Sequence, residues 1–218
     1  CEFLRKSPSL ELADVAYTLQ TGRKTFNYTL AAVANTISQA AETLQQNAPQ
    51  QVFQQRQVRR GKAVVFMFPG QGAQHVGMAR DLYEHDSIFR QHVDHCAELL
   101  ASHLGYDIRL KIFPSQSFAH SQHDIVESAE SNGADAPAEQ LNQTSLAQAG
   151  IFTVSYALAK RLEVDGIVPE QLIGHSVGEF VAACLAGVFS LADALRLIAF
   201  RATAMQQLPP GSMLAVRL

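Results

Sequence analysis

The chain has 218 residues, 47% of them hydrophobic, and a formal net charge of −3 at pH 7. Such a length fits one large domain, or a large domain with a small one, and the slightly negative charge argues against nucleic-acid or anionic-membrane partners. The three cysteines, Cys1, Cys96 and Cys184, are too few and too scattered for a disulfide framework. We therefore expect a globular, cytoplasmic protein without a signal peptide, with Cys184 as a small core residue.

The N-terminal quarter of the chain mixes helical and strand patterns. Residues 10–19 place apolar side chains at positions 12, 15, 16 and 19, which is one face of a helix. Residues 26–34 predict a short strand and residues 36–46 a second helix, whereas the Gln- and Arg-rich residues 45–60 predict a solvated connector before a break near Gly61. This pattern indicates a small α/β unit that is too small to be stable alone.

The remainder of the chain alternates apolar strands with helices. Residues 63–68 read Ala-Val-Val-Phe-Met-Phe and predict a central strand of a parallel sheet, because both faces are apolar. Residues 171–173 and 213–218 predict further strands, and residues 115–142 predict a polar loop. The predicted helices cover residues 78–105, 144–162, 180–188 and 191–208. This order indicates an α/β fold with a parallel sheet.

Four histidines of the first long helix, His85, His92, His95 and His103, lack the accompanying carboxylates of a typical metal site. We interpret them as surface or helix-face residues, and we expect no metal.

The stretch that organises the chain is residues 172–179, Leu-Ile-Gly-His-Ser-Val-Gly-Glu. It matches the Gly-x-Ser-x-Gly pattern of a nucleophile elbow, in which a serine occupies a strained strand-to-helix turn between small residues. Gly174 and Gly178 supply that room, and the turn would present the Ser176 hydroxyl together with the N–H of Val177. So short a motif also occurs by chance, and the alternative is a glycine-rich turn whose serine has no catalytic role.

A second glycine-rich loop, residues 69–72, reads Pro-Gly-Gln-Gly and directly follows the first predicted strand. Its backbone could approach a ligand closely, and the second half of an oxyanion hole is expected from such a loop. The alternative is a plain strand-to-helix turn.

Together these stretches resemble the acyltransferase domain of modular polyketide synthases, a family similar to malonyl-CoA:acyl-carrier-protein transacylases. Residues 68–72, 174–179 and 182–191 carry the resemblance, and residues 10–60 resemble the linker between a ketosynthase and an acyltransferase. The resemblance implies an α/β-hydrolase-like sheet. It divides the chain into a linker domain (1–61), an incomplete large subdomain (62–212) and the start of a truncated small subdomain (213–218), the rest of that ferredoxin-like subdomain being missing. The Cys1 start likewise suggests a piece of something longer.

The resemblance also implies roles for single residues. Ser176 would be the nucleophile, and backbone N–H groups of Gln71 and Val177 would form the oxyanion hole. Arg201, 25 residues after Ser176, would hold the free carboxylate of the extender unit, for which its planar fork is suited.

Two further residues lie near the implied pocket. Gln148 matches a family glutamine there, although a purely structural role is the alternative. His175 is expected to shape the turn and the pocket rather than to act as the base. The family's catalytic histidine follows the serine, whereas all eight histidines of this chain come before or at position 175. We therefore expect the chain alone to be inactive.

The implied reaction is ping-pong transfer. Malonyl-CoA, preferred over methylmalonyl-CoA, would acylate Ser176, and the acyl group would pass to the phosphopantetheine thiol of an acyl carrier protein. No bound cofactor is expected, and an upstream ketosynthase domain is the expected neighbour. A serine esterase or thioesterase is a weaker alternative, against which Arg201 and the loop at 69–72 argue. The third hypothesis is a non-catalytic linker or scaffold.

Overall fold

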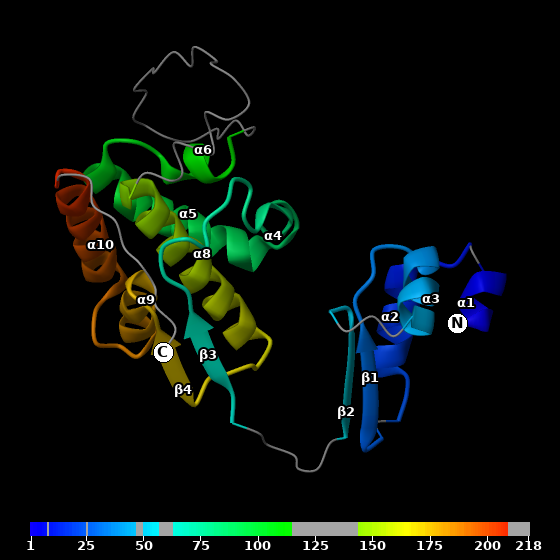
Figure 1. Cartoon of the computed structure of the whole chain (residues 1–218). Helices are drawn as coiled ribbons and strands as arrows, with labels where there is room; N and C mark the ends of the chain where they lie inside the picture. The colour runs from blue at the N-terminus through cyan, green and yellow to red at the C-terminus, as the bar shows by residue number, and fades with distance from the viewer. Residues whose placement is uncertain (8, 25, 47–49, 57–62, 115–143, 209–218) are drawn as a thin grey trace, which may run out of the picture. The chain divides into compact units, whose positions relative to one another are not determined.

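The computed structural model describes residues 1–7, 9–24, 26–46, 50–56, 63–114 and 144–208 (Figure 1). Its contacts divide the chain into two compact units, Cys1–Lys62 and Ala63–Leu218. No helix in the described ranges has the length and apolar character needed to cross a membrane. The loop predicted at 115–142 and the strand predicted at 213–218 lie outside the described residues.

The first unit packs helices against a two-stranded antiparallel sheet. Its elements are α1 (Glu2–Lys6), α2 (Leu12–Thr21), β1 (Tyr28–Ala32), α3 (Ile37–Gln46) and β2 (Val52–Arg56) (Figure 1). The small core comes from one face of α3, with Ile37, Ala40 and Ala41 buried, and from Val52 of β2. The helices predicted at 10–19 and 36–46 and the strand predicted at 26–34 are confirmed, with shifted ends.

The predicted connector at 45–60 is wrong in part, because it contains strand β2. The strand pairs along its whole length with β1, from Ala32 opposite Val52 to Tyr28 opposite Arg56. Residues 52–56 read Val-Phe-Gln-Gln-Arg, which is not an alternating apolar pattern, and in the structure only Val52 of them is buried. Pairing with β1 therefore stabilises β2, and the guanidinium of Arg56 adds a cation–π contact 5.5 Å from the Tyr28 ring centroid.

The second unit is built on two parallel strands, β3 (Val65–Phe68) and β4 (Gln171–Gly174), which pair from Val65 opposite Gln171 to Phe68 opposite Gly174. Helices complete the described part of this unit (Figure 1). They are α4 (Arg80–His85), α5 (Ser87–Leu104), α6 (Ile108–Ile112), α8 (Thr144–Val164), α9 (Val177–Leu185) and α10 (Leu191–Gln206). Parallel strands with intervening helices make this unit an α/β fold, as predicted.

The two faces of strand β3 differ. Phe66 and Phe68 are buried in the core, whereas Met67 is 74% exposed. The strand predicted at 63–68 is confirmed as β3 of a parallel sheet, but among the described residues it pairs with β4 alone and Met67 stays exposed, so its central position is not seen there. The buried face meets the core formed by the helices, whose fully buried large side chains include Phe89, Leu100, Phe113, Phe152 and Ile198.

Side-chain caps mark where the helices begin. The carboxylate of Asp86 accepts from the Phe89 N–H at the start of α5, and Asp107 does the same for Arg109 at the start of α6. Ser190 caps α10 by accepting from the N–H of Asp193. Helix α5 ends at Gly105, whose φ of 78° suits a residue without a side chain.

Candidate active site

The site begins at the turn between β4 and α9. Ser176 has φ 53° and ψ −113°, a conformation that residues other than glycine rarely adopt. A Cβ atom on Gly174 would lie 2.2 Å from the backbone nitrogen of Glu179, and one on Gly178 would lie 2.3 Å from the carbonyl oxygen of Phe68. Both positions therefore require glycine, because the turn packs backbone against backbone.

The hydroxyl of Ser176 faces a basic side chain of α10. Arg201 Nη2 donates to Ser176 Oγ at 3.5 Å, and both residues are half-buried. Within the described ranges, no histidine or carboxylate hydrogen-bonds to Ser176 Oγ. The structure thus brings together two residues 25 positions apart, which the sequence analysis assigned to one site.

Two side chains, those of Gln148 and Phe180, hold the guanidinium of Arg201. Its Nη1 donates to Oε1 of Gln148, whose side chain is almost completely buried in α8. Its Cζ lies 5.8 Å from the ring centroid of Phe180, a cation–π distance. Gln148 in turn donates from Nε2 toward Met205 Sδ at 3.5 Å. An arginine held in this way presents its fork in one orientation, which favours recognition of a planar carboxylate.

Sequence reasoning missed Phe180 and Met205. Helical spacing could have indicated both residues, because Phe180 comes four residues after Ser176 and Met205 four residues after Arg201.

The glycine-rich loop after β3 lies against the same turn. A Cβ atom on Gly70 would lie 2.4 Å from Nδ1 of His175, so the loop and the turn are in close contact. Gln71 is exposed, and its Oε1 accepts from Gln148 Nε2 at 3.4 Å. Val177 is fully buried and is the first residue of α9, so its N–H has no acceptor within the helix.

The histidines of α4 and α5 and the two buried cysteines make none of the contacts described above. On α4 and α5, His85, His95 and His103 are exposed, whereas His92 is half-buried and burial lowers its pKa. The part of the chain that the structure describes holds no group of three or more His, Cys, Asp or Glu residues that could bind a metal ion. Cys184 is buried, as predicted.

The fold and this geometry define an α/β protein with a serine-centred site. The model of the acyl transferase domain family matches residues 65–218, and that of the "CurL-like, PKS C-terminal" family matches residues 1–44. The chain therefore belongs to the acyl transferase domain family.

Relatives extend the likeness over nearly the whole chain. A phenolphthiocerol/phthiocerol polyketide synthase polypeptide of Mycobacterium tuberculosis is 38% identical over 95% of this chain, which spans 13% of that protein. The acyl transferase domain of ZmaA is 35% identical with a TM-score of 0.77, over 96% of this chain and 45% of the solved one. The acyl transferase domain of SpnD, solved with 2-(pent-4-yn-1-yl)malonyl, is 32% identical with a TM-score of 0.69. That match covers 93% of this chain and 43% of the SpnD chain.

Proposed function

We propose that this chain carries the acyl-transfer site of a polyketide synthase, which moves a malonyl-type extender unit from CoA to an acyl carrier protein. The observation that carries the proposal is Arg201, held by buried Gln148 and by Phe180, with its free side directed at Ser176. A fixed cation beside a serine at a strained turn suits a thioester whose acyl group ends in a carboxylate.

In the proposed reaction the turn acts as a nucleophile elbow. Ser176 Oγ attacks the thioester carbon, the C–S bond breaks and CoA leaves as the thiol, so that an acyl-serine ester remains. The N–H groups of Val177 and Gln71 would stabilise the tetrahedral oxyanion. The phosphopantetheine thiol of the carrier protein then attacks the ester and restores the serine. His175, packed against Gly70, supports the turn and the loop.

Malonyl is the proposed extender, in preference to methylmalonyl. The support is sequence-based, namely Val177 directly after the serine and the form of residues 143–148. One methyl group is worth only about 1–3 kcal/mol of discrimination. Competition between the two CoA thioesters on the whole protein decides this point, and a preference for methylmalonyl contradicts it.

Arg201→Ala in the whole protein tests the substrate class. Loss of one partner from a buried charge pair costs about 3–5 kcal/mol, so malonyl transfer should fall on the order of 10²–10⁴-fold. Acetyl transfer should change little, because acetyl has no carboxylate to hold. Arg196→Ala is the matched control, since this arginine is exposed on the same helix. Equal loss of malonyl and acetyl transfer would make Arg201 structural.

We assign residues 1–61 to a ketosynthase–acyltransferase linker domain and residues 62–212 to the large acyltransferase subdomain. The match of residues 1–44 to a polyketide-synthase family supports the first assignment. A non-catalytic scaffold is the second candidate function, because the described residues place no base on Ser176. Labelling of Ser176 by malonyl-CoA in the whole protein separates the two.

A further inference from the structure

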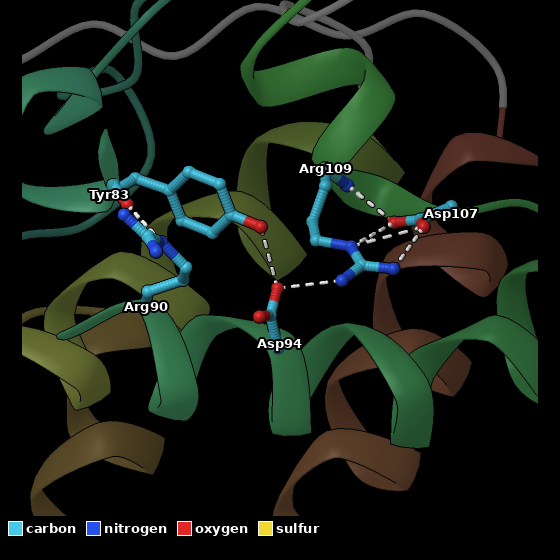
Figure 2. Close-up of polar contacts among 5 residues, drawn as sticks. All are labelled: Tyr83, Arg90, Asp94, Asp107 and Arg109. Atoms are coloured by element: carbon cyan, nitrogen blue, oxygen red, sulfur yellow. Dashed lines mark hydrogen bonds and ion pairs between the residues drawn. The ribbon is translucent and has the colours of Figure 1, made fainter. Parts of the chain in front are cut away.

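We propose that a partly buried polar cluster outside the site around Ser176 positions the loop that carries Gln71 for the reaction. The cluster, here called the α4–α6 clamp, consists of Tyr83, Arg90, Asp94, Asp107 and Arg109 (Figure 2). This inference rests on the proposed function, because the value of a well-placed Gln71 depends on its part in acyl transfer.

The α4–α6 clamp joins three helices through two charges of each sign. Arg109 donates from Nη1 to Asp94 Oδ1 and from Nη2 to Asp107 Oδ2, both at 2.6 Å (Figure 2). Tyr83 donates its hydroxyl to the same Asp94 oxygen at 2.7 Å, and Arg90 Nε donates to the Tyr83 carbonyl at 2.6 Å. Tyr83 and Arg109 are both buried. Every member thus holds at least one other, which restricts where α4 and α6 can lie on α5.

Tyr83 is also held through its ring. The ring stacks on Phe113, just after α6, with centroids 4.6 Å apart. Arg90 Nη2 donates to the carbonyl of Glu84 in the last turn of α4, and this bond adds to the one with the Tyr83 carbonyl. Carbonyls at a helix C-terminus lack intrahelical partners, so a cation there stabilises the end of α4.

The loop at residues 69–79 enters this fixed region directly. The N–H of Tyr83 donates to the Ala79 carbonyl at 3.0 Å, and the N–H of Gly77 donates to the Ile112 carbonyl, at the end of α6, at 2.8 Å. Met78 is buried, and its Cε lies 3.0 Å from where a Cβ on Gly150 of α8 would be. The C-terminal end of the loop is therefore anchored on α4 and α6.

The N-terminal end of the loop is anchored on the serine turn. Phe68, the last residue of β3, pairs with Gly174, and its carbonyl accepts from the N–H of His175 at 3.0 Å. Gln71 thus lies in a loop that is anchored at one end on the serine turn and at the other on the helices of the α4–α6 clamp. A shift of the second anchor moves Gln71 relative to Ser176.

Among the described contacts, Arg201 touches no member of the α4–α6 clamp, and it meets the loop only through Gln148, whose Nε2 donates to Gln71 Oε1 at 3.4 Å. Arg201 belongs to α10 and contacts Gln148 of α8 and Phe180 of α9. Weakening the clamp should therefore lower kcat, through the oxyanion contact, and leave the KM for malonyl-CoA nearly unchanged. A purely structural cluster would lower the folded fraction without this split.

The first test is hydrogen exchange of the loop amides in the full chain. Tyr83→Phe keeps the ring and removes only the hydroxyl, and Asp94→Ala removes the shared acceptor. Both should speed exchange at Gly77 and Met78 about tenfold, whereas Asp94→Asn should restore part of the protection. Ser190→Ala is the control, because it removes the cap of α10 and no atom of the clamp or loop. Unchanged exchange in both clamp variants overturns the proposal.

The second test is steady-state transfer by the whole protein with malonyl-CoA and carrier protein. Tyr83→Phe should lower kcat about threefold to tenfold with KM changed less than about twofold, and Ser190→Ala should change neither. Equal kcat losses in these two variants overturn the positioning role. If the unsubstituted protein transfers no acyl group, the proposed function fails, and the exchange experiment still decides whether the clamp holds the loop.

Discussion

Two residues other than glycine have a positive φ in the described part of the chain, Ser176 and Ala79. The strain at Ser176 is where the proposed chemistry needs an exposed hydroxyl. Ala79, with φ 58° and ψ 26°, lies just before α4 and takes no part in the proposed chemistry. Substituting Ser176 to relieve its strain should therefore abolish function, whereas the strain at Ala79 can be relieved by substitution without affecting the proposed chemistry.

Ala79→Gly should stabilise the protein. The left-handed conformation costs a non-glycine residue about 1–2 kcal/mol, and the extra freedom of glycine in the unfolded chain offsets about 0.4–1 kcal/mol of that. The denaturant midpoint should therefore rise by the equivalent of about 0.5–1 kcal/mol. Ala101→Gly, inside α5, is the control and should lose about 1 kcal/mol. Equal losses in both variants would contradict the strain argument.

Gly178→Ala should damage both the fold and the site. Its Cβ would lie 2.3 Å from the Phe68 carbonyl oxygen, so β3 and α9 must move apart. Overpacking of this kind costs about 1–3 kcal/mol, and the movement displaces Ser176 from Arg201. Gly150→Ala is the contrast, because its Cβ would meet the flexible end of Met78 at 3.0 Å. Chemical denaturation and malonyl transfer measure both effects, and equal tolerance of the two variants would refute the prediction.

At the scale of the elements, Tyr83 of α4 joins α5 through its hydrogen bond to Asp94, and its pKa is raised. Burial, and then the hydrogen bond to Asp94, raises the pKa of Tyr83 to about 12. The unfolded chain loses this proton near pH 10, so between pH 10 and 12 the unfolded state binds fewer protons than the folded one. The stability that Tyr83 contributes is therefore complete below pH 10 and is lost as the pH rises toward 12.

Tyr83→Phe tests this titration. The variant should be less stable than the unsubstituted protein at about pH 8, and the gap in unfolding free energy should shrink between pH 10 and 12. Tyr156, whose pKa burial also raises to about 12, is present in both proteins and cancels in the difference. A gap that stays constant up to pH 12 would show that the Tyr83 hydroxyl is not held in this way.

The elements that the sequence predicted correctly are those with strong local patterns. Helices α5, α8 and α10 follow an apolar period, and the need for glycine at 174 and 178 is local to one turn. Strand β2 could not be predicted, because its pairing with β1 stabilises it, nor could the five-residue helix α6. The contact of Arg201 with Phe180 likewise joins two helices that only the packed fold brings together.

For the whole molecule, the chain spans 13% of its Mycobacterium tuberculosis relative and 45% of the solved ZmaA domain. In such large assemblies one stretch need not hold every group of a reaction. Here the described residues supply a serine, a candidate carboxylate-binding arginine and two candidate oxyanion donors. Among them, no histidine or carboxylate forms a hydrogen bond with Ser176 Oγ.

The 218-residue chain by itself should therefore acylate very slowly. A serine hydroxyl is a weak nucleophile until a base takes its proton, and Arg201, the hydrogen-bond partner of Ser176 Oγ among the described residues, is a donor. Oxyanion stabilisation and binding alone leave about 10³–10⁴-fold acceleration over water in a serine protease that lacks its triad. Labelled malonyl-CoA, with mass detection and Ser176→Ala as the control, measures the rate. Rapid stoichiometric labelling at Ser176 would refute this prediction and make His75 and His175 the first bases to substitute.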